Sequence, residues 1–109
     1  MHMGRSLIYQ EICWSPLTQE WVKVNTDGAN SSSSCQAIAR GVIRDWCERW
    51  VAGFAMHIGI CSITAAELWG IFEGLTLAWD LGYRRIQLET DSRSALKAIF
   101  GFSEWGLEG

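Results

Sequence analysis

The sequence has little proline, little histidine and no excess of positive charge. Of its 109 residues, one is proline, two are histidine and four are cysteine. No two cysteines stand in a Cys-x-x-Cys pair, which argues against a zinc site, because such sites normally need four ligands at close spacing. Nine basic residues face twelve acidic ones, for a formal charge of −3. This balance argues against a protein that binds nucleic acid by charge alone, since such proteins usually carry a basic excess.

Long apolar runs are also missing. No stretch has the length or the flanks of a signal peptide or a membrane span, which predicts an intracellular protein without a membrane partner. The nucleus and the cytoplasm are equally compatible with the sequence. In a reducing compartment the cysteines are expected to be free thiols with packing roles. They are Cys13, Cys35, Cys47 and Cys61.

What is present is enough for one folded domain. Hydrophobic residues make up 49% of the chain, and seven residues are tryptophan, so the chain can build a single core. Residues 1–20 show no sustained period and contain the one proline, and we interpret them as an N-terminal extension. The domain is predicted to span residues 21–109.

Two different periods divide this domain into strands and helices. Alternation of apolar and polar residues predicts four strands, at residues 21–30, 37–45, 50–60 and 85–90. Short connections favour an antiparallel meander of the first three, and the later strand, helix and strand unit favours a fourth strand parallel to the first. The expected fold class is therefore α/β, with a mixed sheet in the order 3-2-1-4.

Apolar residues spaced three and four apart predict a long helix at residues 64–81. Its start fits a capping box formed by Thr64 and Glu67. Its apolar stripe includes Trp69, Phe72 and Trp79, and we expect these aromatic residues to lie in the core. A second, shorter helix is predicted to begin after Asp91 and Ser92.

Asp27 lies near the end of the first predicted strand. Counting by twos places it on the same face as Lys23 and Asn25, away from the valines of that strand. Gly28 follows it and allows the backbone to turn or to approach another group closely. An isolated Asp-Gly pair more often marks a simple turn. This pair becomes a candidate functional site only if other acidic residues are expected close to it.

Two other acids are expected close to Asp27. Glu67 opens the long helix, and Asp91 ends the fourth strand, so all three are expected at one sheet edge, where open α/β sheets bind ligands. Crowded carboxylates repel one another unless a divalent cation lies between them, and oxygen ligands suit Mg²⁺ or Mn²⁺. Each acid alone also has a structural explanation, as a turn residue, a capping-box residue or a helix N-cap. Their shared position is what favours a site.

Four motifs occur in order along this domain. They are NTDGA (residues 25–29), GVIRD (residues 41–45), AELWG (residues 66–70) and LETDS (residues 88–92). Together they resemble the ribonuclease H-like domains found in plants, which are related to retrotransposon reverse transcriptases. The resemblance runs from about residue 21 to about residue 100.

This resemblance implies a function. In the family, the matching acids bind two Mg²⁺ ions that hydrolyse the RNA strand of an RNA–DNA hybrid. It therefore implies that Asp27, Glu67 and Asp91 are both metal ligands and catalytic residues of an endonuclease. It also implies that Gly28 lets the backbone approach the RNA strand. Ser62, beside the start of the long helix, is a weaker candidate for contact with nucleic acid.

The sequence also departs from the family pattern. Arg40 stands where the family commonly shows a glycine, and the residues after Phe100 lack the pattern of the family's last strand and last helix. The resemblance thus implies a C-terminally truncated copy that cleaves hybrids poorly. The alternative function is a catalytically weak or inactive remnant that acts as a nucleic-acid-binding or protein-interaction module. An uncovered apolar face of the sheet would then mediate self-association or bind a protein partner.

Overall fold

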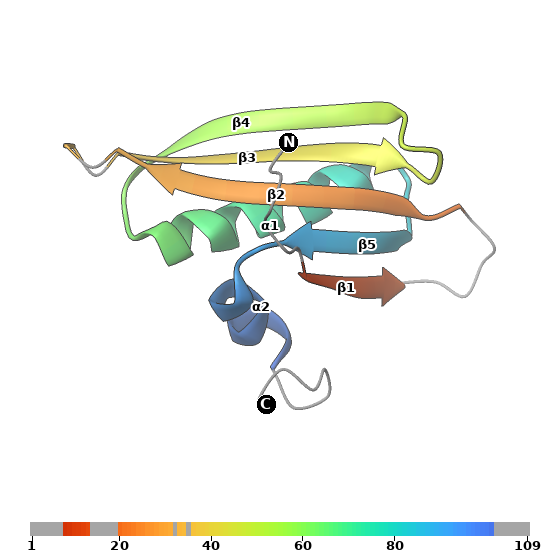
Figure 1. Ribbon diagram of the computed structural model, residues 1–109. Helices are drawn as coiled ribbons and strands as arrows, with labels where there is room; N and C mark the ends of the chain where they lie inside the picture. Colours follow the sequence, from red (N-terminus) through yellow and green to blue (C-terminus); the bar gives the residue numbers. More distant parts are fainter. Residues whose placement is uncertain (1–7, 14–19, 32, 35, 102–109) are drawn as a thin grey trace.

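The computed structural model describes residues 8–13, 20–31, 33–34 and 36–101. Within these ranges the chain forms five strands and two helices (Figure 1). They are β1 (Ile8–Cys13), β2 (Val22–Asn30), β3 (Gln36–Asp45), β4 (Trp50–Ile60), α1 (Ile63–Asp80), β5 (Arg85–Thr90) and α2 (Arg93–Phe100). The strands predicted at residues 50–60 and 85–90 have those same bounds. The prediction that the last strand and helix of the family are missing concerns residues 102–109, which lie outside the described ranges.

The strands form one mixed sheet in the order β1-β5-β2-β3-β4. The pairs β2 with β3 and β3 with β4 are antiparallel, and β2 with β5 is parallel. The predicted order 3-2-1-4 is therefore confirmed, because it corresponds to β4-β3-β2-β5. Strand β2 lies in the middle of the sheet, and its carboxyl end and that of β5 point in the same direction (Figure 1).

Strand β1 lies in the segment that we interpret from the sequence as a partly ordered N-terminal extension, in which no strand is predicted. It pairs antiparallel with β5, with Ile8 opposite Thr90 and Ile12 opposite Ile86. Ile8 and Ile12 pack against the core. The hydrophobic residues of this strand, which reads IYQEIC, do not alternate with polar ones, so the sequence shows no strand period here. The hydrogen bonds that define this strand come from a partner about 75 positions later in the chain.

Helix α1 packs on one face of the sheet through small residues. Its buried positions are Ala66, Gly70, Ile71, Gly74 and Ala78. A Cβ added to Gly74 would lie 2.8 Å from Cγ1 of Val24, so the helix approaches β2 too closely for any larger residue at that position. Close packing of this kind leaves no space for aromatic rings between α1 and β2.

The aromatic residues of α1 lie on its outer side, so their predicted place in the core is wrong. Trp69, Phe72 and Trp79 are between 44% and 59% exposed. The outer and the inner side of this helix are both largely apolar, which is why a spacing of three and four residues could not identify the buried one. Neither helix of the described part is long and apolar enough to cross a membrane.

The sheet face opposite α1 is polar. In β2 the alternate residues Val22, Val24 and Thr26 are buried, and the residues between them point to the other side. This second face carries Lys23, Asn25 and Asp27 of β2, Arg40, Val42 and Arg44 of β3, and Gln87 and Glu89 of β5. The expectation that this face is apolar is therefore wrong for these three strands, since most of these side chains are charged or polar. Self-association or binding of a protein partner through this face stays a prediction.

Candidate active site

Asp27 lies inside β2 and not at its end. The strand continues to Asn30, and Asp27 pairs with Arg40 of β3. Its neighbours Thr26 and Gly28 are buried on the α1 side, so the Asp27 side chain points to the polar face, as predicted. A residue in the middle of a paired strand is not a turn residue. The turn explanation for Asp27 therefore fails.

Gly28 is one of the points where β2 closely approaches α1. A Cβ added here would lie 2.8 Å from the backbone nitrogen of Glu67 and 3.0 Å from its Cγ. Gly28 does not have a positive φ angle, so this position requires a glycine for its small size and not for its conformational freedom. The contact brings the backbone of Glu67 next to the strand that carries Asp27. Contact between Gly28 and an RNA strand stays a prediction.

Glu67 is not part of a capping box. Helix α1 begins at Ile63, and its N-cap is Ser62, whose hydroxyl oxygen accepts a hydrogen bond from the backbone nitrogen of Ala65 at 3.1 Å. The predicted start at Thr64 is therefore wrong, and Glu67 is the fifth residue of the helix. A capping-box acid stands at the third helical position, so capping does not explain Glu67.

Ser62 has a structural role that the sequence did not indicate. Its hydroxyl satisfies one of the free backbone donors at the start of α1. The residue is exposed. Its predicted contact with nucleic acid stays a prediction, and the capping role explains this serine without it.

Asp91 is not the N-cap of α2. Ser92 holds that position, and its hydroxyl oxygen accepts a hydrogen bond from the backbone nitrogen of Ala95 at 3.1 Å. Asp91 follows directly after β5. In the parallel pair of β2 and β5, Asn25 lies beside Glu89, and continuing this register by two residues brings Asp91 level with Asp27. The predicted meeting of the two aspartates at one sheet edge agrees with this register.

The three acids thus share one region of the fold, but their carboxylates do not form a preformed metal site. Within the described ranges, no group of three His, Cys, Asp or Glu side chains is placed to hold a metal ion. The Asp27 carboxylate is instead engaged by Arg40, with Nη2 to Oδ2 at 3.2 Å. The residues still fit Mg²⁺ or Mn²⁺ in donor chemistry and backbone position, because these ions prefer carboxylate oxygens. Binding would require the side chains to reorient.

A shallow groove of about 820 Å³ lies beside Asp27 on the polar face. It is lined by Asn25, Asp27, Arg40, Gly41, Val42, Arg44, Glu48, Gly53, Phe54 and Glu89. Both signs of charge are present among these residues. The groove therefore offers hydrogen-bonding groups and cations next to the candidate acids.

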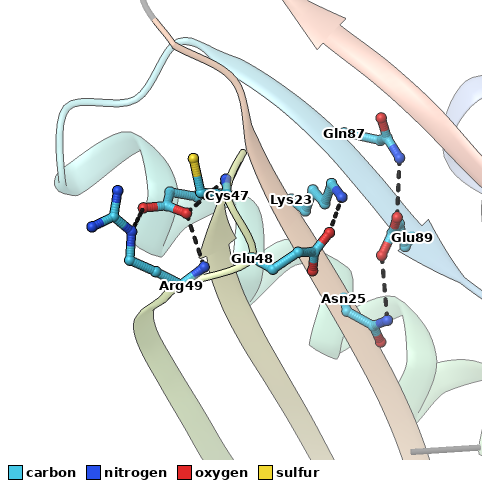
Figure 2. A network of polar contacts seen from close by, with 8 residues as sticks. Lys23, Asn25, Cys47, Glu48, Arg49, Gln87 and Glu89 are labelled. Atoms are coloured by element: carbon cyan, nitrogen blue, oxygen red, sulfur yellow. Dashed lines mark hydrogen bonds and ion pairs between the residues drawn. The ribbon is translucent and has the colours of Figure 1, made fainter.

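Polar contacts fix several side chains of this groove (Figure 2). Nδ2 of Asn25 donates a hydrogen bond to Glu89 at 3.5 Å, and Gln87 donates to the other carboxylate oxygen of Glu89 at 3.0 Å. Lys23 donates to Glu48 in the turn between β3 and β4. This hydrogen bond raises the pKa of Lys23 above its ordinary value. The sequence predicted the outward direction of Lys23 and Asn25 but not their partners, which come from other strands and turns.

Comparison with known proteins identifies similar sequences. A family model described as reverse transcriptase-like matches residues 25–105. A protein of Arabidopsis thaliana that carries the provisional name ribonuclease H protein is 44% identical over 96 residues, which is 88% of this chain. This chain spans only 15% of the length of that protein.

Solved structures with the same arrangement are also found. The ribonuclease H1 of the halophilic archaeon Halobacterium salinarum matches with a TM-score of 0.69 and 27% identity, over 74% of this chain and 61% of that one. The N-terminal ribonuclease H domain of a Mycobacterium tuberculosis protein matches with a TM-score of 0.70 and 23% identity, over 76% and 60%. The LC11 ribonuclease H1, solved in complex with an RNA/DNA hybrid, matches with a TM-score of 0.65 and 17% identity, over 79% and 62%. The last two share the fold at low identity.

Proposed function

Because the chain belongs to the reverse transcriptase-like family of ribonuclease H-like domains, we propose that it is a metal-dependent endonuclease that hydrolyses the RNA strand of RNA–DNA hybrids. In this proposal Asp27, Glu67 and Asp91 hold Mg²⁺ or Mn²⁺ in a two-metal arrangement. One similar structure, the LC11 ribonuclease H1, was solved in complex with an RNA/DNA hybrid, and binding of a hybrid by this chain is part of the proposal.

The observation that carries the proposal is that the three acids share one region of the fold and that none of them has the turn or capping role that its place in the sequence suggests. Asp27 is not in a turn, Glu67 is not in a capping box, and Asp91 is not a helix N-cap. Acids that come together in one region without a capping or turning role are candidates for binding and catalysis. Their common location follows from two features, the contact of Gly28 with Glu67 and the parallel register of β2 and β5.

The residues of the chain would bind and orient the substrate around these acids. When bound, divalent ions would activate a water molecule and stabilise the charge that develops on the departing 3′-oxygen. Asp27 points into the groove on the polar face, where Arg40 and Arg44 provide cations for phosphate groups. Gly28 holds the strand against α1 and so fixes the position of Asp27 relative to Glu67.

A second candidate function is a binding module that does not cleave. The pairing of Asp27 with Arg40 and the lack of a preformed group of three ligands within the described ranges favour it. A module of this kind would bind a hybrid through the groove without a divalent ion, and substitution of an acid would not weaken that binding.

A cleavage assay distinguishes the two functions. The purified chain is incubated with an end-labelled RNA–DNA hybrid and Mg²⁺ or Mn²⁺, beside the variants Asp27→Asn, Glu67→Gln and Asp91→Asn. We expect cleavage of the RNA strand that stops with EDTA and falls at least about 100-fold in each variant. The matched control is Asp80→Asn, which removes an exposed carboxylate at the end of α1 and should cleave normally.

Two other results would contradict the nuclease proposal. If the chain binds the hybrid in fluorescence anisotropy but leaves it intact, and Asp27→Asn binds equally well, the nuclease proposal is wrong and the binding module is favoured. If the chain neither cleaves nor binds the hybrid, both functions are wrong.

A further inference from the structure

Arg40 makes a direct ion pair with the candidate metal ligand Asp27. The two residues are opposite each other in the antiparallel pair of β2 and β3, and Nη2 of Arg40 lies 3.2 Å from Oδ2 of Asp27. Directly opposed residues in such a pair have Cβ atoms only about 5 Å apart. The register of the two strands therefore brings this guanidinium to this carboxylate.

We propose that Arg40 is an internal competitor for the divalent cation at Asp27. In the metal-free protein its guanidinium neutralises Asp27, and Mg²⁺ or Mn²⁺ binds only after displacing it. This inference rests on the proposed function, because it assumes that Asp27 is a metal ligand. It adds to that function a residue that sets the metal affinity.

Charge makes the two cations mutually exclusive at this carboxylate. A guanidinium carries a positive charge, so it repels a divalent ion at the same oxygen atoms. The competition does not abolish metal binding, because the Arg40 side chain is 58% exposed and the Asp27 side chain 35% exposed. An exposed ion pair is weak, and the long arginine side chain can turn to the solvent when a metal ion arrives.

The chain provides a matched control on the same strand. Arg44 also lies on the polar face of β3, where it is opposite Lys23, and it is exposed. It is four residues from Arg40, or about 13 Å along the strand. Its removal changes the net charge of the protein by the same amount as removal of Arg40, but it leaves the pair with Asp27 intact.

The test measures metal affinity and does not depend on cleavage. Mn²⁺ binding is measured by calorimetry and by electron paramagnetic resonance for the unmodified chain, Arg40→Gln, Arg40→Lys, Arg44→Gln and Asp27→Asn. Circular dichroism confirms that each variant is folded. We expect Arg40→Gln to bind Mn²⁺ roughly threefold to tenfold more tightly. Arg40→Lys, which keeps the charge, and Arg44→Gln should each stay within about twofold of the unmodified chain.

Two outcomes separate this inference from the function on which it rests. If Asp27→Asn abolishes binding while Arg40→Gln binds no more tightly than the unmodified chain, the competition is wrong and the metal site stands. If Asp27→Asn binds Mn²⁺ as well as the unmodified chain, Asp27 is not a ligand, and both the metal site and the competition are wrong. An equal gain in Arg40→Gln and Arg44→Gln would also overturn the competition, because it would reflect net charge alone.

Discussion

At the scale of single residues, Asp27 has a charged neighbour that the sequence did not reveal. Three crowded carboxylates repel one another, so the sequence alone predicts that Asp27→Asn stabilises the metal-free chain. The ion pair with Arg40 changes that expectation. Removing the charge of Asp27 also removes an attractive partner, so we now expect a change in the free energy of unfolding of no more than about 0.5 kcal/mol in either direction.

Gly28 provides the first residue-scale prediction. Gly28→Ala should lower the free energy of unfolding by about 1–3 kcal/mol, because its Cβ would lie 2.8 Å from a backbone atom of α1 that cannot move independently. Urea unfolding followed by circular dichroism measures the change. The matched control is Gly70→Ala, whose Cβ would meet its nearest atom at 3.4 Å and which should be neutral or slightly stabilising in the helix. Equal effects of the two substitutions would contradict the close contact.

Lys23 provides a prediction about pH. Its hydrogen bond with Glu48 raises its pKa above the ordinary value of 10.5. A pKa that is raised in the folded state adds stability below the unfolded pKa, and this stability is lost as the pH rises through the folded pKa. Glu48→Gln should therefore unfold at a lower urea concentration than the unmodified chain at pH 7 and at pH 9.

The difference between the two proteins should shrink as the pH rises through the raised pKa of Lys23, because Lys23 then loses its charge in both. Urea midpoints measured from pH 7 to pH 11.5 follow this change. Asp80→Asn is the control, because Asp80 is an exposed acid at the far end of α1 and should differ little at any pH. Equal urea midpoints for Glu48→Gln and the unmodified chain at pH 7 and at pH 9 would show that the Lys23 contact adds no stability.

At the scale of elements, the packing of α1 against β2 explains which of its residues lie on the inner side and which on the outer side. Its inner side consists mostly of alanine and glycine, which allow the helix axis to lie close to β2. The large rings are on the outer side, where Trp69 and Phe72 meet edge to face with centroids 6.0 Å apart. Trp79 stacks under the guanidinium of Arg84, which lies 3.4 Å from the ring centroid. These contacts partly cover rings that the sheet has no space to bury.

The start of α1 gives a prediction at this scale. Ser62→Ala should lower the free energy of unfolding by about 1 kcal/mol, because the backbone nitrogen of Ala65 loses its partner. Ser62→Asp should keep the stability of the unmodified chain, since aspartate caps a helix equally well. Thermal unfolding of the three proteins tests this role. If Ser62→Asp is as unstable as Ser62→Ala, the hydroxyl does not act as the cap.

The same pair of variants tests the predicted nucleic-acid contact of Ser62. A carboxylate at this position would repel a phosphate group. If Ser62 contacts nucleic acid, Ser62→Asp should bind a hybrid more weakly than Ser62→Ala while it remains the more stable protein. Equal binding by both variants would show that capping is the only role of Ser62.

At the scale of the whole molecule, the sheet order decides where the candidate acids lie. The crossover through α1 puts β5 beside β2, so the acids of two distant segments come level with each other. Strand β2 is paired on both sides and carries buried Val22 and Val24. The candidate site therefore begins on a strand that is paired on both sides.

The rate of amide hydrogen exchange should depend on whether a strand lies inside the sheet or at its edge. Amides of β2 and β5 are expected to exchange only when the whole chain unfolds, because each of these strands has a paired neighbour on both sides. Amides of β1 and β4, the two edges of the described sheet, should exchange sooner. Exchange measured by mass spectrometry on peptides from these strands tests the expectation. Protection of β4 equal to that of β2 would contradict it.

The sequence by itself determined the four main strands, both helices, the strand order and the three candidate acids. These features follow from local periods and from the short connections between elements. Both can be read from residues that are close together in the chain. It also placed Asp27 on the face away from the valines of β2, and the burial of Val22 and Val24 confirms this.

Only the tertiary structure decided what each element meets. Strand β1 exists because β5 offers it an edge, and the small side of α1 is buried because β2 comes too close for a ring. Arg40 forms an ion pair with Asp27 because the register of β2 and β3 places the two residues opposite each other. Such contacts join positions that are distant in the chain, and their energy depends on the space and charge that the partner provides. No local pattern contains that information, which is why the sequence indicated the acids but not the cation beside the first of them.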